Sequence, residues 1–186
     1  MHSRLLLVLL VVSLLTTLPY AQQLEASAPD QAMPNLMKVF AREFGESYKM
    51  VPGLAALTAD FDGDAVEDAA LAVTGDNPLA TAAGRGFKVI DPYNSYFGYG
   101  NPKLTSAFSA EPGVPKYILI LHSWREATPK SKFAVVNLPF KKISLGSVLV
   151  KKKPVASITA EESEGLMSAL FWDGKKYRWE ALGMGQ

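Results

Sequence analysis

The chain has 186 residues, no cysteine, and a formal net charge of +1 from 19 Lys and Arg against 18 Asp and Glu. This length predicts a single domain. The lack of cysteine excludes a disulfide framework, a zinc–thiolate site and a cysteine nucleophile. The balanced charge excludes a strongly polyanion-binding chain, and a hydrophobic fraction of 48% is enough for a folded core.

Residues 1–21 have the pattern of a secretory signal peptide. A short start with His2 and Arg4 precedes an apolar run from Leu5 to Val12, and small residues follow up to Ala21. The run is too short to favour a membrane span, although an uncleaved anchor helix is the alternative. We therefore expect cleavage after Ala21, a mature chain without a transmembrane span, and a periplasmic or extracellular location.

The mature chain begins with a segment of different composition. Residues 22–33 are rich in Ala, Gln, Pro and Ser, which predicts a flexible leader before a single β-rich domain over residues 34–186. Within that domain, apolar residues at helical spacing predict one amphipathic helix over about 34–45. These residues are Leu36, Met37, Phe40 and Phe44.

The remainder of the domain shows short apolar runs that Gly, Asp, Pro and other turn residues separate. The runs are residues 54–59, 69–73, 87–90, 117–121, 133–138, 147–150, 155–159, 166–171 and 177–181. Their β-branched and aromatic content predicts strands, and Asp173-Gly174 predicts a hairpin turn. The expected fold class is α+β, mainly β: an antiparallel sheet with one N-terminal helix. Its four later strands would form a meander, of which a propeller-blade-like sheet is one form.

The sharpest motif is an acidic loop between two strand candidates. Asp60, Asp62, Asp64 and Asp68 occupy the first, third, fifth and ninth places of residues 60–68. Calcium takes six to eight oxygen ligands, and alternate residues of a tight loop can converge on one ion, with the Val66 carbonyl as a further ligand. The alternative is an acidic turn held by its own side chain–backbone hydrogen bonds, without an ion.

Residues 57–75 resemble a single FG-GAP or VCBS-type repeat, whose core reads strand, Asp-x-Asp-Gly-Asp-Gly-x-x-Asp, strand. The resemblance implies a calcium loop between two strands of a propeller blade, with the four Asp side chains and the Val66 carbonyl as ligands. The family's second Gly is Ala65 here, which weakens the site or relaxes the loop if that position needs a left-handed backbone. Other blades are not apparent, so a propeller would require self-association.

Aromatic residues gather in the long irregular stretch of residues 91–116. Tyr93, Tyr96, Phe97 and Tyr99 alternate with Gly, Asn and Ser. Flat rings with polar tips suit the binding of sugars or peptides. The alternative is that the rings fasten the loop to the sheet by burying themselves.

The mature chain has one histidine, His122. A Ser-His-Asp triad with Ser123 or Ser95 would make the protein a small secreted hydrolase that acts on envelope sugars or peptides. A structural hydrogen bond at a strand end is the alternative for this histidine. Since no nucleophile motif or cofactor cradle appears, the sequence favours a protein that is not an enzyme.

Charge is unevenly distributed along the chain. Residues 22–100 hold 5 basic and 11 acidic residues, a net −6, and residues 101–186 hold 13 basic and 7 acidic, a net +6. The lysines that cluster near strand ends are Lys130, Lys132, Lys141, Lys142, Lys151, Lys152 and Lys153. They would meet a cell-envelope protein or glycan rather than nucleic acid, or simply protect edge strands. The leading hypothesis is an exported, non-enzymatic binding or structural domain with a calcium loop.

Overall fold

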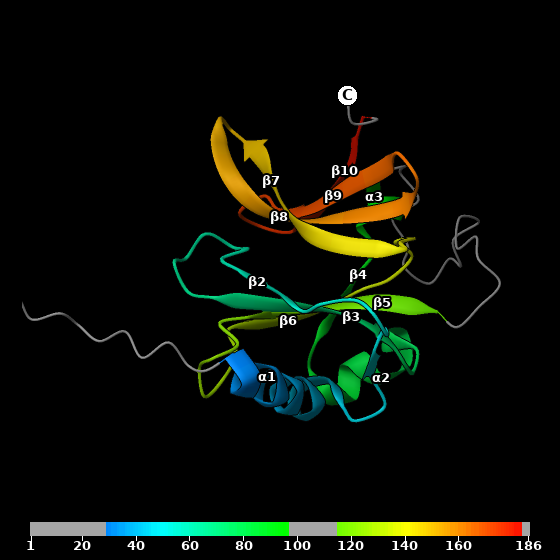
Figure 1. Ribbon diagram of the computed structural model, residues 1–186. Coiled ribbons are helices and arrows are strands. Elements are labelled where there is room, and N and C mark those ends of the chain that lie inside the picture. The colour runs from blue at the N-terminus through cyan, green and yellow to red at the C-terminus, as the bar shows by residue number, and fades with distance from the viewer. Residues whose placement is uncertain (1–28, 97–114, 184–186) are drawn as a thin grey trace, which may run out of the picture.

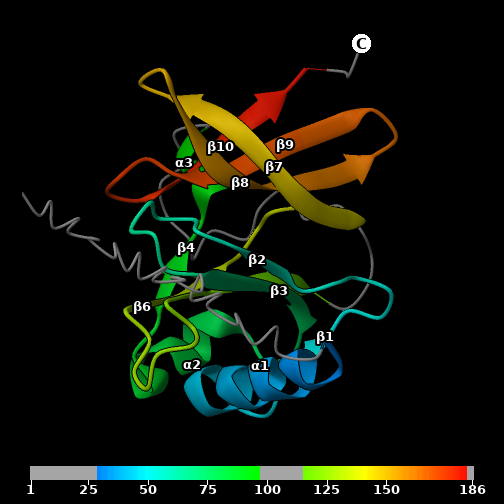
Figure 2. The ribbon, with the colours of Figure 1, turned by 60° about the vertical axis from the view of Figure 1, so that its left-hand side comes forward.

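Figure 1 shows the computed structural model, which describes residues 29–96 and 115–183. Its elements form three layers, with α1 and α2 against one face of a six-stranded sheet and a four-stranded sheet on the other face (Figures 1 and 2). The helices are α1 (Pro29–Phe44), α2 (Pro78–Arg85) and α3 (Pro92–Tyr96). The strands are β1 (Lys49–Met50), β2 (Leu57–Ala59), β3 (Asp68–Thr74), β4 (Lys88–Ile90), β5 (Lys116–His122), β6 (Ser131–Val135), β7 (Lys142–Val150), β8 (Lys153–Ser163), β9 (Leu166–Trp172) and β10 (Tyr177–Leu182).

The strand order confirms the predicted fold class, α+β and mainly β. The six-stranded sheet has the order β1-β3-β5-β6-β4, with β2 also paired to β3. The four-stranded sheet has the order β10-β9-β8-β7 and is antiparallel throughout, which is the predicted meander. The strands thus form two stacked sheets rather than one, and the pair β4–β6 is parallel.

Alternation along β3 and β5 divides the core into two layers. Leu71 and Leu119 face the helices, whereas Ala70 and Ile120 face the second sheet. Because both faces are covered, the apolar runs in these strands are unbroken rather than alternating. The same period of two places Asp68 and His122 on the face between the sheets.

Several boundaries differ from the predictions. Helix α1 begins at Pro29, so residues 29–33 of the predicted flexible leader are helical. Helices α2 and α3 were not predicted, and α3 shows that the stretch after residue 91 is not wholly irregular. The predicted signal peptide and residues 22–28 lie outside the described residues. In the two described ranges, no helix is long and apolar enough to cross a membrane.

Candidate functional site

The acidic loop, residues 60–67, connects β2 to β3, and the pair Ala59–Asp68 closes its base. The Asp60 carboxylate organises the turn from within. Its Oδ1 accepts hydrogen bonds from the backbone N–H groups of Gly63 (2.7 Å) and Asp64 (3.1 Å), and its Oδ2 accepts one from Ala65 (2.9 Å). One side chain therefore fixes the path of the chain, as Asp does in many tight turns.

The backbone at Ala65 is left-handed, with φ of 67°. This is the position at which the repeat family has its second Gly. A side chain with a Cβ costs about 1 kcal/mol in this conformation. The loop therefore holds an alanine in a conformation that favours glycine.

Two further carboxylates of the loop share one ammonium group. Lys130 Nζ lies 2.8 Å from Asp62 Oδ2 and 2.7 Å from Asp64 Oδ2. The Asp62 side chain is only 4% exposed, whereas that of Lys130 is 51% exposed. The hydrogen bonds to Asp62 and Asp64 raise the pKa of Lys130, and the bond from Lys130 lowers the pKa of Asp64.

His122 joins this loop to the second sheet. Its Nδ1 lies 3.1 Å from Asp62 Oδ2, and its Nε2 lies 2.7 Å from the Tyr177 hydroxyl on β10. A carboxylate only accepts hydrogen bonds, so a neutral His122 donates from Nδ1 and accepts from Tyr177 at Nε2. Burial lowers the pKa of His122, which favours this neutral form.

Asp68 is fully buried at the start of β3. Its Oδ2 accepts hydrogen bonds from the backbone N–H groups of Phe61 (2.8 Å) and Asp62 (3.3 Å), and its Oδ1 accepts one from Ser123 (2.8 Å). Burial, together with the nearby Asp62 charge, raises the pKa of Asp68 to about 6 against these bonds. The side chain thus ties the acidic loop to the β5–β6 connection.

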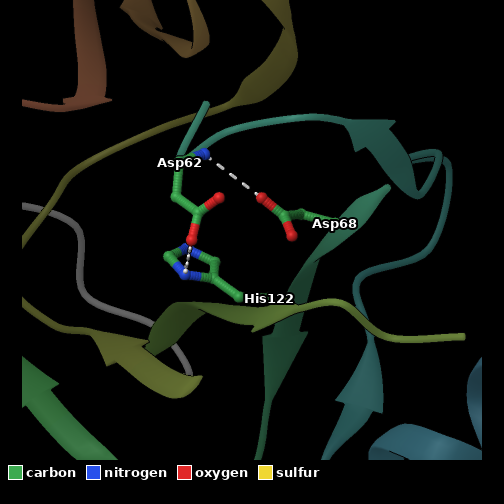
Figure 3. A group of neighbouring side chains, drawn as sticks. All are labelled: Asp62, Asp68 and His122. Carbon is green, nitrogen blue, oxygen red and sulfur yellow. Dashed lines mark hydrogen bonds and ion pairs between the residues drawn. The ribbon is translucent and has the colours of Figure 1, made fainter. Parts of the chain in front are cut away.

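These residues form two overlapping groups that could hold a metal ion. Asp60, Asp62 and Asp64 make one, and Asp62, Asp68 and His122 make the other; within each group the ligand atoms lie within 4.8 Å of one another. Asp62 belongs to both. Figure 3 shows one of its oxygens at the His122 ring and the other turned toward the side of Asp68. Among the described residues this second oxygen, Oδ1, is buried and has no hydrogen-bond partner, so Asp62 can bind a cation there.

The predicted ligands therefore divide between the two groups. Asp60, Asp62 and Asp64 come together as the spacing predicts. Asp68 joins them only through Asp62, because it belongs to the second group, with Asp62 and His122. At Val66 the backbone N–H donates to Asp64 Oδ1 (2.9 Å). The role of the Val66 carbonyl as a ligand stays a prediction.

The aromatic candidates are only partly described. Tyr96 ends α3 and is 59% exposed, with its ring 4.7 Å from that of Trp179 in an edge-on contact. Tyr93 lies in α3, and nothing of its side chain is described. Phe97 and Tyr99 lie outside the described residues. The proposed aromatic binding surface thus remains a prediction.

The sequence patterns pointed to His122 and Lys130 only in other roles, a catalytic triad and a lysine cluster, and they did not indicate Tyr177. Lys130 lies far from the acidic loop along the chain, 68 residues after Asp62. The pairing of β3 with β5 and the stacking of the two sheets bring these residues together. The one local signal was a lone polar residue, His122, at the end of an unbroken apolar run.

The hydrolase alternative relied on His122. Both of its ring nitrogens are occupied, by Asp62 and by Tyr177, and the ring is 1% exposed. Ser123 is buried and gives its backbone N–H to Asp68, and Ser95 is exposed on α3. The hydrogen bonds of His122 therefore do not include either serine.

The predicted lysine cluster is spread over several places. Lys132 bonds to Glu43 Oε2 (3.0 Å) and to the Arg85 carbonyl (2.8 Å). Lys151 and Lys152 form the two-residue turn of the β7–β8 hairpin, with φ of 51° and 68°. Lys142 lies at the opposite end of β7. The lysines thus do not make one continuous patch.

Comparisons with protein-family models, with curated proteins and with solved structures found no match to this chain.

Proposed function

We propose that this protein is an exported, non-enzymatic binding or structural domain whose acidic loop holds one divalent cation, with calcium as the ion. One observation carries the proposal. Three carboxylates meet within 4.8 Å, and the most buried of them, Asp62, keeps an oxygen without any hydrogen-bond partner. A buried carboxylate oxygen without a donor is costly, and a cation that binds Asp62 through both of its oxygens would remove that cost.

The donor atoms favour calcium over other metals. Asp60, Asp62 and Asp64 offer only oxygen, which suits a hard cation, and water would complete the six to eight ligands that calcium takes. A zinc or copper site would use nitrogen or sulfur. The chain has no cysteine, and its only histidine in the described residues already bonds to Asp62 and Tyr177. The proposal also agrees with the FG-GAP or VCBS resemblance of residues 57–75.

An ion in this place would act as a structural clamp. The loop joins β2 to β3. From the β5–β6 connection, Ser123 bonds to Asp68 at the end of the loop, Arg125 to Glu67, and Lys130 to Asp62. A cation that binds only the folded loop stabilises the fold by mass action. In an exported chain without disulfides, such a clamp replaces a covalent one.

The thermal unfolding midpoint tests the proposal. We expect calcium to raise the wild-type Tm and EDTA to reverse this effect. Asp62→Asn with Asp64→Asn should abolish the calcium effect, because the variant keeps the side-chain volumes and loses both charges. Glu46→Gln with Asp76→Asn removes the same charge from two exposed positions outside the loop, and it should leave the effect intact. A wild-type Tm that is the same in calcium and in EDTA would overturn the proposal.

Export and the envelope partner are part of the same proposal. They rest on the N-terminal pattern of residues 1–21 and on the charge asymmetry of the mature chain. Mass spectrometry of the protein from a bacterial host should find a mature form that begins at Gln22 in the periplasm or medium. Recovery of the full chain in the cytoplasm alone would contradict export.

A further inference from the structure

The position of Lys130 bears on how the proposed site accepts its ion. Its ammonium group bridges Asp62 Oδ2 and Asp64 Oδ2 at 2.8 Å and 2.7 Å. These are two of the three carboxylates that would bind a cation. A metal ion that takes both oxygens must therefore replace the ammonium group, because two cations repel each other at this distance.

We propose that Lys130 is a resident, tethered cation of the acidic loop, which an incoming ion must displace and which makes the site selective for divalent over monovalent ions. This inference rests on the proposed cation site. It gives Lys130 a role in the choice between divalent and monovalent ions, which the spacing of the acidic residues alone does not predict.

Charge gives the reason for the selectivity. With Lys130 in place, the three carboxylates contribute −3 and the ammonium group +1, so the formal charge of the site is −2. A monovalent ion that replaced Lys130 would leave the same −2 and lose the tether. A divalent ion would leave −1, so its electrostatic gain exceeds that of the ammonium group. Sodium or potassium should therefore compete poorly with Lys130.

The surrounding contacts make this exchange local. The Lys130 side chain is 51% exposed, so its long stem can turn into water without unfolding the chain. Its backbone N–H stays bonded to the His122 carbonyl (3.0 Å). The β5–β6 connection also keeps three other hydrogen bonds to the acidic segment: Ser123 donates to Asp68, and Trp124 and Arg125 donate to Glu67. Displacement thus frees one side chain rather than a whole loop.

Calcium titration calorimetry of the full mature chain, at fixed ionic strength, tests this inference. Lys130→Gln should bind calcium about tenfold more tightly than wild type, because two partly exposed ion pairs no longer oppose the ion. Lys130→Arg keeps the charge and should stay within about threefold of wild type. Lys132→Gln is the matched control, since Lys132 bonds to Glu43 and Arg85 rather than to the loop, and it should not change the affinity.

Stability separates this role from a merely structural one. In EDTA, Lys130→Gln should lower the Tm, because Asp62 and Asp64 then repel each other without a counter-charge. In saturating calcium the same variant should show a larger calcium-induced rise in Tm than wild type. A structural lysine would lower the Tm by the same amount in both conditions, and that result would overturn the inference.

The outcomes distinguish the two proposals. Calcium binding by wild type with unchanged or weaker binding by Lys130→Gln overturns the role of Lys130 and leaves the cation site standing. Binding by Lys130→Gln but not by wild type supports the role of Lys130 and overturns the calcium site in the natural protein. No binding by either protein overturns both.

Discussion

Two Asp-Gly turns of this protein differ in how their carboxylate charge is balanced. One is Asp62-Gly63 in the acidic loop between β2 and β3, and the other is Asp173-Gly174 between β9 and β10. In each turn one carboxylate accepts hydrogen bonds from backbone N–H groups: that of Asp60 in the first turn and that of Asp173 in the second. Only the first turn carries additional acids beyond the one that shapes it.

In the β9–β10 turn, both carboxylate oxygens of Asp173 have partners within the turn and its flanking strand. Asp173 Oδ1 accepts from the backbone N–H groups of Lys175 and Lys176, both at 2.9 Å, and Oδ2 lies 2.6 Å from Arg178 Nε. Partial burial opposes the charge, but Arg178 and the two N–H groups still lower the pKa of Asp173 to about 2. Every oxygen has a partner, so this turn has no use for an ion.

The acidic loop holds more charge than its turn requires. Asp60 already fixes the backbone, yet Asp62 and Asp64 share Lys130, and Asp62 Oδ1 is buried without a partner. Surplus carboxylates of this kind repel one another unless a cation joins them. The contrast teaches that acid beyond the needs of the turn, rather than the Asp-Gly signature, is what indicates a cation site.

The largest expected effect comes from removing Asp68, the buried acid that follows the loop at the start of β3. Asp68→Ala leaves the buried N–H groups of Phe61 and Ser123 without acceptors, which should lower the free energy of unfolding by about 3 kcal/mol. Asp173→Ala exposes its N–H groups to water and should cost about 1 kcal/mol. Urea unfolding measures both. Equal costs would mean that the two turns do not differ in the way described.

The pH dependence of stability should have opposite signs for the two acids. The pKa of Asp68 is raised to about 6 from 3.8, so its neutral form stabilises the fold below pH 4, and this contribution is lost as the pH rises through 6. The pKa of Asp173 is lowered to about 2, so its contribution is present above pH 4 and is lost as the pH falls through 2.

Unfolding in EDTA across this pH range measures the two slopes. Between pH 4 and 6, wild type should lose up to about 2 kcal/mol relative to Asp68→Asn, whose amide does not titrate. Between pH 2 and 4, wild type should gain about 1 kcal/mol relative to Asp173→Asn, a value reduced for the partly exposed carboxylate. Slopes of the same sign would be inconsistent with the two environments.

The hydrogen bond between the sheets should have a smaller effect. Tyr177→Phe leaves His122 Nε2 buried without its donor and should cost about 1.5 kcal/mol in unfolding free energy. Tyr48→Phe is the matched control, because the Tyr48 hydroxyl bonds to Thr81 at 3.0 Å in a partly buried place within the other half of the fold. We expect this control to cost clearly less. A larger loss of unfolding free energy in Tyr48→Phe than in Tyr177→Phe would show that the His122–Tyr177 hydrogen bond does not link the sheets.

The smallest effect concerns the left-handed residue of the acidic loop, Ala65. Ala65→Gly relieves a left-handed residue and should raise the free energy of unfolding in denaturant titrations by about 0.5 kcal/mol, the relieved strain less the unfolded-state entropy that glycine adds. Ala55 is exposed and its φ is not positive, so Ala55→Gly should lower stability by about 0.5 kcal/mol through unfolded-state entropy. Destabilisation by both substitutions would show that Ala65 carries no strain.

The sequence predicts the strands well because period and turn chemistry are local properties. The apolar runs at residues 69–73 and 117–121 became β3 and β5, and Asp173-Gly174 lies in the β9–β10 turn. Helix α2 escaped prediction because its sequence, PLATAAGR, is only eight residues long and its apolar residues besides Pro78, the one that is buried, are Leu79 and three alanines. Its signals are the Asn77 cap and Gly86 in the left-handed conformation.

The candidate site was predictable only in part for the same reason. Alternate carboxylates in one tight loop can be recognised from spacing, and Asp60, Asp62 and Asp64 do come together. Lys130 and Tyr177 arrive through the β5–β6 hairpin and the second sheet, and no spacing rule encodes such contacts. Asp68 likewise bonds to backbone N–H groups, because the alternation of side chains along β3 places it in the interior.

A crystal structure of the mature chain grown with calcium tests the cation site most directly. We predict one anomalous peak within about 2.6 Å of oxygens from Asp60, Asp62 and Asp64, a typical calcium–oxygen distance, with Lys130 Nζ turned away from both carboxylates. A structure at saturating calcium with no peak in the loop, and with Lys130 still bridging Asp62 and Asp64, would contradict the site.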